Sequence, residues 1–233
     1  MFQRTTLVTG ASHALGLEFV RQCLMRGDQV IAAARNTARI SALADLRAKY
    51  GTLEFLSLDA ADAASVADAV SILESITRSI DRLIVTQAEP ALHERTGESE
   101  REAHIDSLSA TSLVEHYRRH AVAPVLLART LLPMLTAAGS ARILFLSTLT
   151  GSIAAKVNGG NYATCASAAG LHMLARTLAH DLADRKINVC IGNVGDSPNP
   201  SEQSIAELLD VAENLPANRN GAFIDSKGAD CRW

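Results

Sequence analysis

The sequence predicts a single α/β domain, residues 1–233, with a doubly wound parallel sheet of about seven strands and helices on both of its faces. Three observations support this fold class. Short runs of β-branched and other apolar residues alternate with longer segments of helical periodicity. The chain is 48% hydrophobic and 20% charged, which is enough apolar material for one large core. No internal repeat or linker divides it into smaller units.

The first expected strand, Arg4–Thr9, is separated by a glycine-containing turn from a helix over Ala14–Arg26. That helix has apolar residues near helical spacing, and Gly27 is a natural stop at its carboxyl end. Gln29–Ala34 is a continuous apolar run, which suits a strand covered on both faces. The elements expected next are a helix capped by Asn36 and ending near Tyr50, a strand at Leu53–Leu58, a helix over Ala63–Ile80 and a strand at Arg82–Thr86.

The second half of the chain begins with its longest loop-like segment, the polar stretch Glu89–Asp106. A long helix over Leu113–Ala138 and a strand at Arg142–Ser147 follow, and Asn161–Ala183 is rich enough in Ala and Leu to form a largely buried helix. The remaining elements are a strand, a helix and a candidate seventh strand: Ile187–Ile191, Ser201–Asn214 and Ala222–Asp225. We expect the strand order to reverse beside the first strand, as doubly wound sheets do.

Composition excludes several classes of function. The chain has 22 Lys and Arg against 25 Asp and Glu, a net charge of −3, whereas a nucleic-acid surface needs a basic excess. No apolar run approaches the roughly 18 residues that span a bilayer, and the first residues lack the apolar region of a secretory signal. The four cysteines are scattered with no CxxC pattern, which fits a reducing cytosol. We therefore expect a cytoplasmic protein that binds neither nucleic acid, membrane nor metal.

The segment Leu7–Val20 (LVTGASHALGLEFV) places a glycine-rich turn between a strand and a helix, where backbone N–H groups can approach a pyrophosphate. This string resembles the TGxxxGxG turn of the short-chain dehydrogenase/reductase family, and the resemblance covers the full chain. It is most similar to the C-factor-like branch at four segments: Gly16–Gln22, Gly151–Ala154, Ser167–Leu174 and Gly221–Trp233. The resemblance implies a Rossmann-type fold and hydride transfer between NAD(P)(H) and a carbonyl or alcohol.

The resemblance also implies four catalytic positions in this sequence. The family's Tyr, the general acid/base, falls on Thr164, and the Lys that lowers the pKa of that Tyr falls on Ala168. The Ser that positions the carbonyl falls on Thr148, whose hydroxyl could still do so, and the Asn that supports a water falls on His120. Three of the four positions are therefore lost and the fourth is altered, so that no standard catalytic residue is expected.

Among the expected cofactor-binding positions, those near adenosine match the family better than those near nicotinamide. Arg35 lies where the family places a partner for a 2′-phosphate, and Asp59 matches the Asp that hydrogen-bonds adenine. No acidic residue stands at the end of the second strand to repel a 2′-phosphate, which favours NADP(H) as the cofactor, if any is bound. The candidate cofactor-binding residues are Gly10, Ser12, His13, Leu15, Gly16, Arg35, Asp59, Ala60 and Ala88.

Other positions of the expected cofactor site depart from the family. Ala14 replaces the middle glycine of the turn, and Glu89 puts a carboxylate where a glycine normally packs against the nicotinamide ribose. The loop after Gly195 (GDSPNPSEQS) is shorter than in the branch and lacks its Thr-Asp pair. We therefore predict a nucleotide-binding or protein-interaction module without ordinary reductase activity, a pseudoenzyme whose protein partner the sequence does not identify.

Several of these residues also have a purely structural interpretation. Gly10 and Gly16 serve the tight turn and helix packing with or without a ligand, and an Asp such as Asp59 before a helix is commonly a turn residue. His116 and His120 share a helix face as a metal pair would, but no third ligand is near in sequence, which favours surface or interface histidines.

The alternative hypothesis is an active NADPH-dependent carbonyl oxidoreductase that uses a non-standard acid such as Tyr162 or His120. Taking Tyr162 as the acid places Ala166 at the Lys position, so neither register supplies the cation.

We also expect a homodimer through the helices 113–138 and 161–183. The second of these helices is apolar over well over half of its circumference, so that it must bury a second face.

Overall fold

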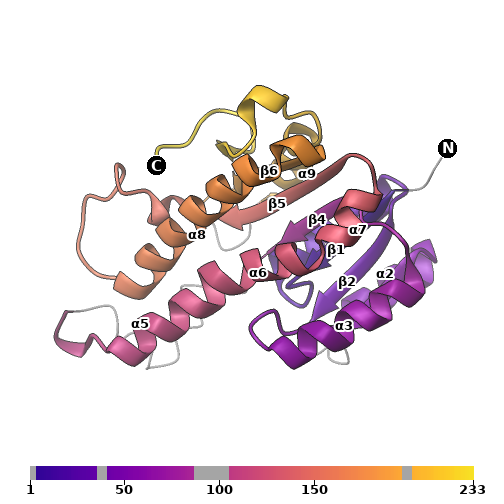
Figure 1. Ribbon diagram of the computed structural model, residues 1–233, viewed down its shortest axis with the longest axis horizontal. Helices are drawn as coiled ribbons and strands as arrows, with labels where there is room; N and C mark the ends of the chain where they lie inside the picture. The colour runs from indigo at the N-terminus through magenta and orange to yellow at the C-terminus, as the bar shows by residue number, and fades with distance from the viewer. Residues whose placement is uncertain (1–3, 36–40, 87–104, 196–200) are drawn as a thin grey trace.

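The computed structural model describes residues 4–35, 41–86, 105–195 and 201–233, which form a central sheet between two layers of helices (Figure 1). Within these ranges the strands are β1 (Thr5–Thr9), β2 (Gln29–Ala34), β3 (Leu53–Ser57), β4 (Arg82–Val85), β5 (Ala141–Ser147), β6 (Ile187–Asn193) and β7 (Phe223–Asp225). They pair in parallel in the order β3-β2-β1-β4-β5-β6-β7. The predicted doubly wound sheet, with its reversal beside β1, is confirmed.

Helices cover both faces of this sheet. One face carries α1 (Ala14–Met25), α2 (Ser41–Tyr50) and α9 (Glu202–Glu213). The other carries α3 (Ala63–Ile76), α6 (Ala123–Thr130), α7 (Leu132–Ala137) and α8 (Tyr162–Asp181). Successive strand residues point to opposite faces, so Leu7 belongs to one core cluster and Val8 to the other. The strands are mostly apolar because both of their faces are buried.

The expected single helix over Leu113–Ala138 is wrong. The segment forms four successive pieces: α5 (Ala110–Tyr117), a π-helical turn (Arg118–Val122), α6 and α7. Pro124 and Pro133 lie in the first turns of α6 and α7. A proline has no backbone N–H and its ring crowds the preceding turn, so each proline interrupts the helical hydrogen bonds and starts a new segment.

Smaller differences occur at other boundaries. Helix α3 ends at Ile76 rather than Ile80, because Thr77 is extended (φ −148°, ψ 154°) and its hydroxyl donates to the Ser79 carbonyl at 2.9 Å. The expected cap Asn36, most of the polar stretch 89–106 and the residues 196–200 lie outside the described ranges. Among the helices that the structure describes, none has the length and apolar character needed to cross a membrane.

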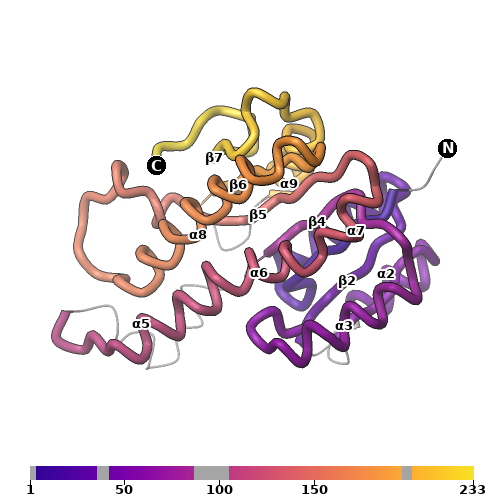
Figure 2. The backbone as a smooth tube through the Cα atoms, in the orientation of Figure 1, coloured from indigo at the N-terminus to yellow at the C-terminus, as the bar shows by residue number. Residues whose placement is uncertain are grey.

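Helices α5 and α8 lie side by side at one end of the molecule (Figures 1 and 2). His116 Nδ1 is 3.0 Å from Ser167 Oγ, and the Tyr117 ring packs closely on Gly170. The expectation that α8 has a second large apolar face is corrected in part, because Leu174 and Leu178 pack against the protein's own core. What stays exposed on α8 is a narrower strip that includes Met173, which is 67% exposed.

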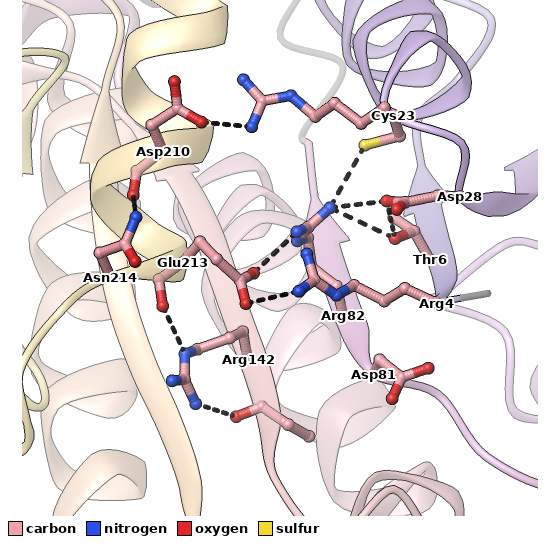
Figure 3. A network of polar contacts seen from close by, with 12 residues as sticks. Arg4, Thr6, Cys23, Asp28, Asp81, Arg82, Arg142, Asp210, Glu213 and Asn214 are labelled. Atoms are coloured by element: carbon pink, nitrogen blue, oxygen red, sulfur yellow. Dashed lines mark hydrogen bonds and ion pairs between the residues drawn. The ribbon is translucent and has the colours of Figure 1, made fainter. Parts of the chain in front are cut away.

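A buried charge network lies at the amino ends of the strands (Figure 3). The Arg82 guanidinium donates to Asp28 Oδ2 at 2.8 Å and to Glu213 Oε2 at 2.7 Å, and Arg4 is a second partner of Glu213 at 3.0 Å. Burial favours the neutral form of the Glu213 carboxyl, but the hydrogen bond and charge of Arg82 outweigh it and lower the pKa of Glu213. This network fastens α9 to the strands β1, β2 and β4.

Candidate functional site

A cavity of about 150 Å³ opens at the carboxyl ends of the strands β1 to β4. The ends of neighbouring parallel strands meet at one edge of the sheet, and the reversal of strand order beside β1 leaves a crevice there. The strand ends and the turns after them supply most of the lining: Thr9, Gly10, Ser12, His13, Ala34, Arg35, Leu58, Asp59, Ala60, Ala61, Val85 and Thr86. Arg119 and His120, from the π-helical turn, complete it.

Six of the nine sequence-predicted cofactor residues line this cavity: Gly10, Ser12, His13, Arg35, Asp59 and Ala60. Leu15 and Gly16 do not. Both belong to the first turn of α1, where Leu15 packs against the core and Gly16 is buried. Ala88 and Glu89 lie outside the described residues. The structure therefore brings together residues from three separate strand ends that sequence spacing could only suggest.

The two glycines of the turn have strict packing roles. Gly10 has a left-handed φ of +64°, and a Cβ there would lie 2.7 Å from the Thr86 carbonyl oxygen. A Cβ at Gly16 would collide with the Gly10 carbonyl. The fold thus requires both glycines whether or not a ligand binds, as the structural interpretation holds, and the case for a nucleotide site has to rest on the other lining residues.

Asp59 serves both the turn and the cavity. Its Oδ1 accepts from the Ala61 N–H at 3.0 Å, which is the turn contact, and its backbone N–H donates to Ser65 Oγ at 2.9 Å. Its Oδ2 lies 3.7 Å from Arg119 Nη1 in the cavity. The carboxylate that the family resemblance assigns to adenine therefore faces the cavity with an arginine beside it.

Arg119 is a cavity residue that the sequence reasoning missed. It follows Arg118 at the start of the π-helical turn, and both guanidiniums bind Glu115, one turn earlier in α5. These hydrogen bonds, opposed by only slight burial, lower the pKa of Glu115 to about 2. The available signal was the charge pattern Glu-x-x-Arg-Arg, but a regular helix over 113–138 would not show which arginine turns toward the strand ends.

His120 also lines the cavity. Burial, together with the charges of His116, Arg119 and Arg35, lowers the pKa of His120 to about 4, so its imidazole is neutral at pH 7. The rings of His116 and His120 are 4.2 Å apart between centroids. No group of three His, Cys, Asp or Glu side chains that could hold a metal ion occurs among the described residues.

The other three family catalytic positions lie away from the cavity lining. The Thr148 hydroxyl contacts that of Thr150 and accepts from its N–H at 3.3 Å, which caps a short 3₁₀ turn. The carbonyl of Thr164 accepts from Ser167 Oγ at 3.1 Å. Ala168 is buried against Gly151. These side chains offer two hydroxyls and a methyl group, with no phenol and no cation among them.

Two further groups at this end of the fold could take part in proton transfer. His172 Nε2 lies 2.8 Å from Ser147 Oγ, but the ring is buried and burial lowers the pKa of His172 to about 4. Lys156 Nζ contacts the Gly160 carbonyl at 3.2 Å and Cys165 Sγ at 3.3 Å. Neither group reproduces a phenol with an ammonium ion beside it.

A family model described as short chain dehydrogenase matches residues 4–204. The chain belongs to the short-chain dehydrogenase family. A relative described as a "Probable NADP-dependent dehydrogenase" of Dichelobacter nodosus is 35% identical over 107 residues, which are 46% of this chain and 97% of the relative. The C-signal of Myxococcus xanthus is 27% identical over 123 residues, 49% of this chain and 74% of that protein.

Solved structures of two carbonyl reductases share the whole fold. The NADPH-bound carbonyl reductase from chicken fatty liver is 26% identical, covers 100% of both chains and has a TM-score of 0.85. Carbonyl reductase Sniffer of D. melanogaster has a TM-score of 0.87 with 100% coverage of both chains, and at 22% identity it supports the fold alone. The Rossmann-type architecture of this short-chain dehydrogenase is thereby established along its full length.

Proposed function

We propose that this member of the short-chain dehydrogenase family binds an NADP(H)-type nucleotide in the cavity at the strand ends and lacks ordinary carbonyl reductase activity. The observation that supports the proposal is the difference between the side chains of the cavity and those at the family's catalytic positions. The cavity retains charged side chains suited to a phosphorylated ribose, whereas the family's catalytic Tyr and Lys positions hold Thr164 and a buried Ala168.

Arg35 supports the preference for a 2′-phosphate. It is exposed at the end of β2 and lines the cavity, and within the described ranges it forms no ion pair with a carboxylate. A guanidinium in this position can donate two parallel hydrogen bonds to a phosphate. The names of two similar proteins, an NADPH-bound carbonyl reductase and an NADP-dependent dehydrogenase, agree with this preference.

The absence of reductase activity follows from proton chemistry. Carbonyl reduction needs a group that donates a proton to the developing alkoxide near neutral pH. Thr164 has an aliphatic hydroxyl, and the family position of the Lys that would lower the pKa of the proton donor holds Ala168. His120, the acid of the alternative hypothesis, has a pKa of about 4 and is therefore already neutral at pH 7. Tyr162, the other candidate, begins α8 with Ala166 at its Lys position.

We further propose that, within the family, the protein resembles the C-factor-like branch, and its similarity to the C-signal supports this. We also propose that the protein forms a homodimer through α5, α6 and α8. Exposed apolar side chains on these helices provide the face: Val114, Tyr117, Leu126, Tyr162 and Met173. Apolar patches rimmed by polar residues commonly mark protein–protein contacts, and a two-fold pairing is the commonest kind.

Calorimetry with NADP⁺, NAD⁺ and 2′,5′-ADP tests nucleotide binding by the full chain. We expect NADP⁺ to bind about 10-fold to 100-fold more tightly than NAD⁺, because hydrogen bonds to a charged group contribute about 1.5–3 kcal/mol. Arg35→Gln should reduce this preference. Arg47→Gln, an exposed arginine that does not line the cavity, is the matched control. Equal affinities would contradict the role of Arg35, and no binding at all would leave the glycine turn a purely structural role.

A further inference from the structure

The cavity contains a second arginine, which has no assigned role in the proposed nucleotide site. Arg35 comes from the end of β2 and Arg119 from the π-helical turn after α5, and both line the same cavity. Both also lie close enough to His120 to lower the pKa of that imidazole. Asp59 is the one carboxylate among the described lining residues. The cavity thus presents two guanidiniums to a ligand against a single negative charge.

Arg119 is held by contacts that it can give up at little cost. Its Nε donates to Glu115 Oε1 at 2.6 Å, and its Nη1 lies 3.7 Å from Asp59 Oδ2, which is too long for a hydrogen bond. The Arg119 side chain is 39% exposed, and exposed ion pairs contribute little to stability. The Asp59 contact therefore leaves part of the guanidinium available to a ligand.

Arg118 keeps Glu115 paired when Arg119 moves. Its Nε and Nη2 each donate to one carboxylate oxygen of Glu115 at 2.8 Å, a bidentate arrangement, and its Nη1 donates to the Ala61 carbonyl. If Arg119 leaves Glu115, that carboxylate still has two charge-assisted hydrogen bonds. The neighbouring arginines thus have different tasks, since Arg118 fastens α5 to the β3–α3 turn and Arg119 faces the cavity.

We propose that Arg119 is a second phosphate-binding residue, which joins Arg35 on the phosphate monoester of a nucleotide's ribose and exchanges its contact with Asp59 for that phosphate. The proposal rests on the proposed nucleotide site and adds a second residue that favours ligands with the ribose phosphate. Two guanidiniums on different secondary-structure elements can bind one phosphate dianion from two sides. Each guanidinium offers paired N–H donors that match the phosphate oxygens. The exchange also frees Asp59 to accept a hydrogen bond from the rest of the ligand.

The test compares two probes that differ only by the phosphate, 2′,5′-ADP and 5′-AMP, measured by calorimetry on the full chain. Arg119→Gln should weaken binding of 2′,5′-ADP about tenfold, about 1.4 kcal/mol, and change the affinity for 5′-AMP by less than about twofold. Arg47→Gln is the matched control, because it removes an exposed guanidinium that does not line the cavity. We expect it to leave the ratio of the two affinities unchanged.

The proposal is overturned if Arg119→Gln weakens both probes equally, if it weakens neither, or if Arg47→Gln has the same effect. If the wild-type protein binds neither nucleotide, the proposed nucleotide function fails, and inorganic phosphate then decides about Arg119 alone. A rise in melting temperature with millimolar phosphate that Arg119→Gln abolishes would support the two-arginine site. The same rise in both proteins, or none in either, would overturn it.

Discussion

Arg82 Nη1 lies 2.8 Å from Asp28 Oδ2, and both side chains are almost completely buried, at 3% and 5% exposure. Thr6 Oγ1 donates to the same carboxylate oxygen at 2.8 Å, and the second arm of the guanidinium reaches Glu213. The pair joins the start of β4 to the residue before β2 underneath β1 (Figure 3). Such a pair adds little stability compared with apolar residues, but removing one partner leaves an uncompensated buried charge.

Arg82→Met is therefore expected to lower the free energy of unfolding by about 3–5 kcal/mol, measured by urea denaturation. Arg47→Met is the control, because it breaks the exposed pair with Glu54 at 3.4 Å and should cost less than about 1 kcal/mol. A loss below about 1 kcal/mol for Arg82→Met would contradict this expectation and mean that Asp28 finds another partner.

Stability should fall as the pH is lowered from 6.5 toward 4. Burial lowers the pKa of His172 to about 4, whereas a histidine in the unfolded chain takes up its proton near pH 6.5. The unfolded state binds more protons in this window, so the contribution is fully present above pH 6.5 and is lost as the pH falls through the folded-state pKa. The shift corresponds to about 3 kcal/mol for His172.

His172→Gln should flatten this pH dependence, because glutamine can still reach Ser147 but does not titrate. Ser147→Ala separates the two effects, since it removes the hydrogen bond and keeps the imidazole. Urea denaturation at several pH values gives the slope. An unchanged slope in His172→Gln would show that other groups, such as His120 or Glu213, dominate the acid response.

Purified protein is expected not to oxidise NADPH or NADH with a panel of aldehydes and ketones. The family positions for the proton donor and its tuning cation hold Thr164 and Ala168. Thr164→Tyr combined with Ala168→Lys should not restore activity, because Glu89 and the short loop after Gly195 remain. Turnover of wild-type protein at ~1 per second or faster, typical of enzymes, would refute the pseudoenzyme proposal.

Light scattering at micromolar concentration should give twice the 24.7 kDa mass of the chain. Met173→Glu places a charge in the exposed strip of α8 and should yield a monomer that keeps its nucleotide affinity. Ile72→Glu is the control, because Ile72 is an exposed apolar residue on α3, which is not one of the three helices of the proposed interface. A wild-type monomer that does not change on concentration would rule out the proposed interface.

The sequence by itself predicted the sheet well. Every expected strand is present with bounds that differ by at most two residues at either end, because a strand buried on both faces is mostly apolar and is bounded by polar or glycine residues. The glycine turn followed from the same alternation, whereas Arg35 and Asp59 were implied as site residues by the family resemblance. In a parallel sheet, residues just after a strand must meet at the carboxyl edge.

The tertiary structure alone decided which side chains enter the cavity. Arg119 and His120 come from a segment about sixty residues after Asp59, and they reach the cavity because the helix is broken there by a π-helical turn and is fastened to Ala61 by Arg118. Likewise, Leu174 and Leu178 pack against the core because of how α8 lies on the sheet, which helical periodicity does not specify. Periodicity fixes which residues share a face, whereas the orientation of that face depends on packing between elements far apart in the chain.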